Sequence, residues 1–238
     1  MVLRILAFSS SRAGNDAYLQ TAAPVIKEFL GEVPLSVAFI PFASVDNDYQ
    51  VYADKVREGL AGMPHTIKVA LPANAKQVIA QSDAIMVGGG NTFKLLHDLY
   101  ALDIFDLIKQ KVQSGTSYTG WSAGSNITGP TIGTTNDMPI IQPFSFKSLG
   151  FFSFQINPHY YNVVTEGFNG ETRDQRLEEY LKLNKDSKVV CLPEGTALKL
   201  DENKLIFIGQ SGGVVLSRRG EKLLRKEICS QTDLNFLQ

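Results

Sequence analysis

The sequence has little of what marks a secreted, membrane or nucleic-acid-binding protein. Its 238 residues include only two cysteines, Cys191 and Cys229, which are too few for a disulfide framework and lack metal-ligand spacing. It contains no run of about 18 apolar residues, so no segment is expected to span a membrane. With 23 basic and 24 acidic side chains, it has no excess positive charge for binding a nucleic-acid backbone.

The N-terminal eight residues are apolar, but they contain Arg4 and lack a small-residue cleavage site. They therefore predict a first strand and not a signal peptide. The low cysteine content is compatible with a reducing compartment, and we expect a cytoplasmic protein. A composition of 44% hydrophobic and 20% charged residues is ordinary for a globular chain. Because no repeat or linker interrupts it, we expect a single α/β domain over residues 1–238.

Apolar runs and helical periodicity alternate through the first half of the chain. We predict strands at 2–8, 35–42, 66–71, 84–87 and 116–121, and helices at 16–30, 49–63, 75–81, 92–100 and 103–113. This alternation favours a mostly parallel sheet covered by helices on both faces, a three-layer αβα sandwich. The second half is less regular: 128–150 shows little periodicity. We predict strands at 151–157 and 188–192, a helix at 172–184, and short antiparallel strands at 198–200, 205–208 and 214–217.

The strand at 116–121 runs into Gly120-Trp121-Ser122-Ala123-Gly124, which fits the G-x-S-x-G nucleophile elbow. In that motif a sharp strand-to-helix turn exposes the serine hydroxyl, and the flanking glycines leave room where strand and helix meet. The turn also aims the N–H of Ala123 at the place where negative charge would develop. The alternative is a plain glycine-rich turn after a strand.

A serine hydroxyl needs a base, and histidine is the usual one near neutral pH. Of three histidines, His65 begins a short strand and His97 lies within a helix. His159 follows a predicted strand end, where open parallel sheets carry ligands and catalytic groups. By elimination we select His159, against the alternative of a structural loop histidine.

An acid should fix the tautomer of the base, and two acids are candidates. Glu194 follows the apolar strand at 188–192, so it is expected at the same sheet edge as Ser122. Asp137 lies in an irregular loop soon after the elbow. Each could instead have a local structural role: Asp137 as a turn-capping side chain and Glu194 as a solvated turn residue.

The run Gly88-Gly89-Gly90 follows the strand at 84–87 directly. Its bare backbone N–H groups suit an anion, so Gly89 and Gly90 are expected to complete an oxyanion hole with Ala123. A phosphate-binding loop is the competing interpretation. The run lacks the spacing of a P-loop or of a dinucleotide-binding fingerprint, which disfavours that interpretation.

Taken together, these motifs resemble the peptidase E family, the aspartyl dipeptidase group of serine peptidases. The similarity spans about residues 35–195. Six blocks occur in the family's order and spacing: Val87–Phe93, Gly120–Gly124, Thr134–Ile140, Gln155–His159, Gly170–Arg173 and Leu192–Gly195. The resemblance implies a fold like that of class I glutamine amidotransferases and hydrolysis of dipeptides with an N-terminal aspartate, without a cofactor or metal. It implies Ser122 as nucleophile, His159 as base, and Asp137 or Glu194 as the third member.

A substrate with an N-terminal aspartate calls for a fixed cation, and Arg173 lies in the first turn of the helix at 172–184. A cation there opposes the helix dipole, which invites a functional explanation. Arg176, one turn further along the helix, is the alternative candidate for this cation. Glu171 is expected to hold Arg173 or to meet the substrate ammonium group.

The chain departs from the family at Ser125, where alanine is usual, at Thr196-Ala197 in place of Asn-Trp, and in the tail after Gln210. The competing functions are hydrolysis of isoaspartyl or cyanophycin-type dipeptides, an esterase with the same elbow, and a non-catalytic binding protein. A glutaminase is disfavoured because a serine occupies the elbow. The expected partner is a small dipeptide, neither nucleic acid nor membrane, and the oligomeric state is left open, a homodimer included.

Overall fold

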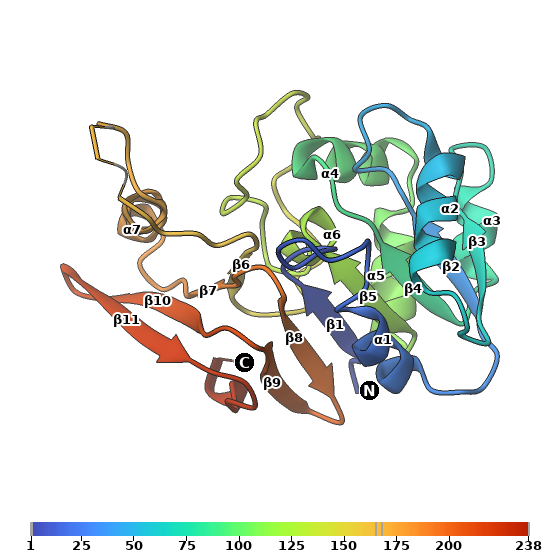
Figure 1. Cartoon of the computed structure of the whole chain (residues 1–238). Helices are drawn as coiled ribbons and strands as arrows, with labels where there is room; N and C mark the ends of the chain where they lie inside the picture. Colours follow the sequence, from blue (N-terminus) through green and yellow to red (C-terminus); the bar gives the residue numbers. More distant parts are fainter. Residues whose placement is uncertain (1, 165, 168, 238) are drawn as a thin grey trace.

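The larger sheet is mostly parallel, as predicted. The computed structural model describes residues 2–164, 166–167 and 169–237. Seven strands lie in the order β3-β2-β4-β5-β1-β8-β9 (Figure 1). The parallel part consists of β1 (Ile5–Phe8), β2 (Ser36–Ile40), β3 (Thr66–Val69), β4 (Ala84–Val87) and β5 (Ser117–Trp121). The antiparallel edge consists of β8 (Thr196–Asp201) and β9 (Lys204–Gly209).

Helices cover both faces of this sheet, because successive strand residues point to opposite sides. Leu6 and Phe8 of β1 share a buried cluster with α1 (Ala23–Leu30) and α2 (Tyr49–Gly59). Ile5 and Ala7 belong to a second cluster on the other face. That face is covered by α3 (Ala75–Ala80), α4 (Thr92–Ala101) and α5 (Phe105–Gln113). The predicted three-layer α/β arrangement is confirmed.

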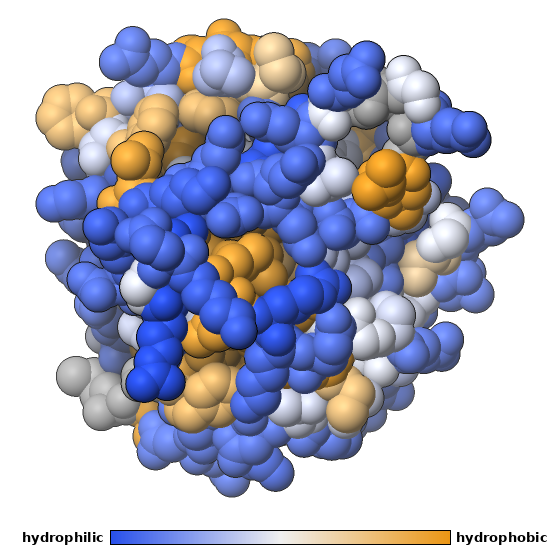
Figure 2. Space-filling view, turned by 90° about the vertical axis from the view of Figure 1, so that its left-hand side faces the viewer, coloured by the Kyte–Doolittle hydropathy of each residue, from blue (hydrophilic) through white to orange (hydrophobic). Residues whose placement is uncertain are grey.

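A second sheet lies beside the first, which the sequence did not predict. It has the order β11-β10-β7-β6, formed by β6 (Gln155–Asn157), β7 (Val189–Cys191), β10 (Gly213–Arg219) and β11 (Lys222–Ile228). The helix α7 (Arg173–Leu183) packs on it through Leu177 and Leu181. Figure 1 shows this sheet and α7 to one side of the larger sheet. Viewed from that side, the surface is largely hydrophilic, with hydrophobic side chains showing in a few places (Figure 2).

The helix predicted at 16–30 begins later than expected. Residues 18–22 form turns, with Leu19 at a φ of 60°, and Pro24 lies in the first turn of α1. Proline has no backbone N–H, so it suits that first turn and not a helix interior. The predicted strand at 151–157 is likewise shorter, and only Gln155–Asn157 pairs.

Residues 128–150 are irregular, as predicted, with one bridge between Thr131 and Lys147. The chain ends in a short 3-10 helix, η1 (Asn235–Leu237). Within the described ranges, no helix has the length and apolar character needed to cross a membrane.

Candidate active site

Ser122 lies between β5 and the four-residue helix α6 (Ala123–Asn126). Its backbone has φ 53° and ψ −113°, a conformation that residues with a side chain rarely adopt. A Cβ on Gly120 would lie 2.5 Å from the carbonyl oxygen of Gly124, and one on Gly124 would lie 2.2 Å from that of Val87. The two glycines are therefore needed where α6 passes close to β4 and β5. This is the strand-turn-helix context that the G-x-S-x-G pattern predicts.

His159 and Glu194 form a hydrogen-bonded chain with Ser122. The Nε2 atom of His159 lies 2.9 Å from Ser122 Oγ, and its Nδ1 atom lies 2.8 Å from Glu194 Oε1. The two side chains follow β6 and β7, which are parallel neighbours, so the carboxyl ends of these strands bring them together. They extend from the smaller sheet towards the elbow of the larger one. The strand before Glu194 was expected in the elbow's own sheet, but β7 belongs to the smaller sheet; Glu194 itself lies between β7 and β8, and β8 is part of the larger sheet.

Asp137 makes different contacts. Its Oδ2 atom accepts hydrogen bonds from the backbone N–H of Thr92, at 2.7 Å, and from the hydroxyl of Thr135, at 3.1 Å. Thr92 is the first residue of α4, so the Asp137 carboxylate satisfies an N–H group that the helix leaves free. Of the two candidate acids, the geometry therefore places Glu194 against the histidine and Asp137 at a helix start.

The run Gly88–Gly90, here called the glycine bend, lies against the elbow at Ser122. A Cβ on Gly89 would lie 2.9 Å from the Cβ of Ser122, so no larger residue fits there. The N–H groups of Gly89, Gly90 and Ala123 donate no hydrogen bond to another described residue. The predicted oxyanion-hole residues are thus brought together, with N–H groups that a substrate oxygen could use.

Two cavities meet at Ser122. One, of about 220 Å³, is lined by Ser122, His159, Asp137 and Arg173 among others. The other is wider, about 950 Å³, and shares Ser122, His159 and Asp137, with Gly89 and Gly90 on its wall. The predicted nucleophile, base and glycine loop therefore face accessible space. The side chain of His159 is 41% exposed and that of Glu194 is 52% exposed.

Arg173 is the cation of the smaller cavity. It is half-buried, and its one described side-chain hydrogen bond runs from Nη1 to Asn157 Oδ1, at 3.3 Å. No described carboxylate pairs with it. Burial lowers the pKa of Arg173, and the nearby Arg176 lowers it further. Glu171 faces Arg176 at 3.8 Å and does not line the cavity, so the structure does not bring it to the site as expected.

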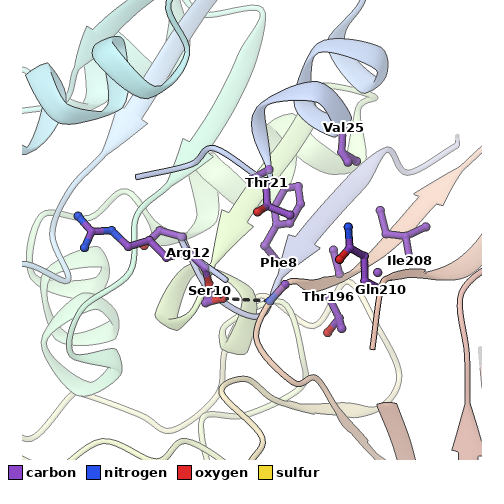
Figure 3. A pocket seen from close by; sticks show the side chains of 13 residues that line it. Phe8, Ser10, Arg12, Thr21, Val25, Thr196, Ile208 and Gln210 are labelled. Carbon is purple, nitrogen blue, oxygen red and sulfur yellow. Dashed lines mark hydrogen bonds between the residues drawn. The ribbon is translucent and has the colours of Figure 1, made fainter. Parts of the chain in front are cut away.

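A third cavity, of about 230 Å³, lies beside β1 and α1. Figure 3 shows its apolar side chains, Phe8, Val25 and Ile208, with the guanidinium group of Arg12 directed away from them. None of the described residues that line it is a predicted catalytic residue. The N–H of Gly195 lies 3.4 Å from Ser10 Oγ at its edge. This cavity is therefore distinct from the candidate active site.

The other histidines lie outside the site. His97 Nδ1 lies 2.9 Å from Asp98 Oδ1, and His65 precedes β3. No group of His, Cys, Asp or Glu side chains that could hold a metal ion occurs in the described ranges. Asn157 accepts the hydrogen bond from Arg173, a role that the sequence does not predict, because an asparagine inside a buried strand gives no recognisable signal.

Comparison with known proteins identifies the family of the chain. A family model described as peptidase family S51 matches residues 5–208. A peptidase E of Nostoc sp. is 45% identical over 238 residues, covering 100% of this chain and 97% of that protein. A peptidase E of Shewanella amazonensis is 46% identical over 210 residues, covering 88% and 89% of the two chains.

Solved structures share the fold. A crystal structure of a protein from Listeria monocytogenes EGD-e has a TM-score of 0.68 at 22% identity, covering 89% of this chain and 100% of that one. A peptidase from an acI-B1 Actinobacterium has a TM-score of 0.66 at 16% identity, covering 98% and 97%. These likenesses establish the architecture alone.

The fold and the family match together define an α/β peptidase. More particularly, the chain belongs to peptidase family S51, and the resemblance to peptidase E that its six motifs carry is confirmed.

Proposed function

We propose that this peptidase is a serine dipeptidase that hydrolyses Asp-X dipeptides through an acyl-enzyme on Ser122. The observation that carries the proposal is the hydrogen-bonded chain from Ser122 through His159 to Glu194. Ser122 and His159 line the same cavity as Arg173. A serine hydroxyl is a poor nucleophile, so Ser122 needs a base, which is His159, and an acid that orients the base, which is Glu194.

In the first half-reaction, His159 Nε2 takes the proton of Ser122 as Oγ bonds to the carbonyl carbon of the aspartyl residue. The carbonyl π pair moves to its oxygen, which the N–H groups of Ala123 and of the glycine bend stabilise. The tetrahedral adduct then re-forms the carbonyl and breaks the C–N bond. His159 returns its proton to the leaving amine, which departs as the free X residue.

In the second half-reaction, water attacks the ester carbon and gives a proton to His159. The second adduct collapses, the C–Oγ bond breaks, and Ser122 regains its proton as aspartate leaves. Throughout, the carboxylate of Glu194 accepts the Nδ1–H of His159. This fixes the tautomer that can accept a proton at Nε2 and stabilises the imidazolium that forms.

Arg173 is assigned to the side-chain carboxylate of the substrate. Its guanidinium is half-buried and has no described carboxylate partner, so its charge is partly desolvated without compensation. A bound carboxylate would offset that cost with charge-assisted hydrogen bonds. Arg176 is the weaker candidate, because it faces Glu171.

The proposal is tested by assaying Asp-Leu, isoAsp-Leu, Ala-Leu and a simple p-nitrophenyl ester side by side, with wild type and His159→Ala. We expect Asp-Leu to be the best substrate and its turnover to depend on His159. Preferential turnover of isoAsp-Leu would reassign the linkage, and faster turnover of the ester would favour an esterase. Equal turnover by His159→Ala would remove the base from the mechanism.

A further inference from the structure

The glycine bend passes through a space with no room for side chains. A Cβ on Gly88 would lie 2.6 Å from the hydroxyl of Tyr52, and one on Gly90 would lie 2.3 Å from the carbonyl oxygen of Ala43. Gly90 also has a φ of 135°, which favours glycine. Glycine is needed here, but its conformational freedom would also let the peptide between Gly89 and Gly90 turn over unless another group holds it.

One hydroxyl holds that peptide. The hydroxyl of Tyr52, in α2, donates to the carbonyl oxygen of Gly89 at 3.1 Å. The same hydroxyl accepts a hydrogen bond from the indole Nε1 of Trp121 at 3.0 Å. An indole N–H only donates, so the single proton of the phenol is free to go to Gly89. Among the described residues, no other group donates to the Gly89 carbonyl.

The direction of this carbonyl fixes the direction of an N–H group. In a planar trans peptide the C=O and the following N–H point in opposite directions. Because the Gly89 oxygen is turned to Tyr52, the N–H of Gly90 is turned away from Tyr52. That N–H donates to no other described residue, and Gly90 lines the same wide cavity as Ser122.

We propose that Tyr52 is a positioning residue for the oxyanion hole: its hydroxyl locks the Gly89–Gly90 peptide so that the Gly90 N–H stays available to the substrate oxygen. The inference rests on the proposed serine mechanism and adds to it a hydroxyl whose described hydrogen bonds go to Gly89 and Trp121 and not to Ser122, His159 or Glu194. Trp121, the residue before the nucleophile, orients the tyrosine in turn and so couples the bend to the elbow.

The surroundings suit a fixed, protonated donor. The Tyr52 ring packs edge-on against Phe39, with centroids 5.0 Å apart, and against Tyr18, at 6.3 Å. Burial raises the pKa of Tyr52, so its hydroxyl keeps the proton that it donates. Phenylalanine at position 52 would keep the ring contacts and remove the hydroxyl alone.

The test compares wild type, Tyr52→Phe and the matched control Tyr49→Phe. Tyr49 is in the same helix, but its hydroxyl bonds to Asn47 and Lys94 and not to the glycine bend. Steady-state kinetics on Asp-Leu, a thermal melt and inhibition by an aspartyl aldehyde, which forms a tetrahedral adduct, are measured for each. Ser122→Ala reports whether the activity depends on the serine.

We expect Tyr52→Phe to lower kcat by about tenfold or more, with KM within about twofold, since an oxyanion donor acts in the transition state. Aldehyde inhibition should weaken by a similar factor, and Tyr49→Phe should match wild type. The inference is overturned if Tyr52→Phe keeps wild-type kcat, if only KM changes, or if Tyr49→Phe loses as much. Absence of Ser122-dependent activity in wild type would instead overturn the proposed function, and this inference with it.

Discussion

The backbone N–H of His159 donates to the hydroxyl of Ser9 at 2.9 Å, which links the proposed base to the end of β1. The same hydroxyl donates to the carbonyl oxygen of Leu192, at 2.7 Å, just after β7. Ser9 is fully buried and directly follows β1 of the larger sheet, whereas His159 and Leu192 follow β6 and β7 of the smaller sheet. The Ser9 side chain therefore links the two sheets beside the proposed base.

Replacing Ser9 by alanine should reduce both stability and turnover. The change leaves the His159 N–H without its partner, at a cost of about 1–3 kcal/mol in the free energy of unfolding, while the Leu192 carbonyl loses one bond and keeps that from the Tyr160 N–H. The base should also lose its alignment, which lowers kcat more than it changes KM. Urea unfolding and steady-state kinetics measure the two effects.

Ser148→Ala is the matched control for Ser9. Ser148 is also buried and its hydroxyl also donates to a carbonyl, that of Gly129, but it lies away from His159. This variant should lose stability and keep its kcat. Equal loss of kcat in the two variants would show that Ser9 has no special role at the base.

Glu194→Gln and Asp137→Asn distinguish the two candidate acids. The glutamine cannot stabilise the imidazolium, so kcat should fall by about 100-fold or more with little change in stability. Asp137→Asn weakens the acceptor at the start of α4, so its main effect should be a lower melting temperature. Kinetics and thermal melts of both variants are compared. The reverse pattern, with kcat lost only in Asp137→Asn, would assign the third position to Asp137.

Arg173→Met should weaken the recognition of the substrate's aspartyl side-chain carboxylate. Loss of a charge-assisted contact costs about 1.5–3 kcal/mol, so kcat/KM for Asp-Leu should fall by about 10- to 100-fold. Activity on Ala-Leu should stay the same, and Arg176→Met should behave like wild type on both substrates. Selectivity for Asp-Leu over Ala-Leu that survives in Arg173→Met would mean that another group reads the carboxylate.

The two cysteines should differ in reactivity. Cys191 is buried in β7, and burial raises the pKa of its thiol well above the ordinary value, whereas Cys229 is exposed. Thiolate is the reactive form, so iodoacetamide at about pH 8 should label Cys229 alone in the folded protein and both cysteines in denaturant. Mass spectrometry counts the labels. Rapid labelling of Cys191 in the folded state would contradict the packing of β7.

The sequence predicted the elements whose signal is local. The elbow around Ser122 has a defined pattern, and only three histidines competed for the role of base, so His159 could be selected. The parallel strands β1, β2 and β4 are largely apolar runs separated by helical periodicity, and such runs are recognisable without tertiary information.

What the sequence did not predict depends on contacts between distant segments. The smaller sheet pairs β6 with β7 across more than thirty residues, and no local pattern indicates which distant strands will pair. The strand β11 is mostly exposed, so it has no hydrophobic pattern from which it could be predicted. Choosing Glu194 over Asp137 depended on that pairing. Tyr52 could not be found either, because its bonds reach Gly89 and Trp121 in other parts of the chain.

The most direct test of the central claim is kcat/KM for Asp-Leu in Ser122→Ala, with circular dichroism to confirm that the variant is folded. The structure places the Ser122 hydroxyl 2.9 Å from the nitrogen of His159, so we predict a fall of several powers of ten in a fully folded variant. Turnover equal to that of wild type would contradict the assignment of Ser122 as the nucleophile.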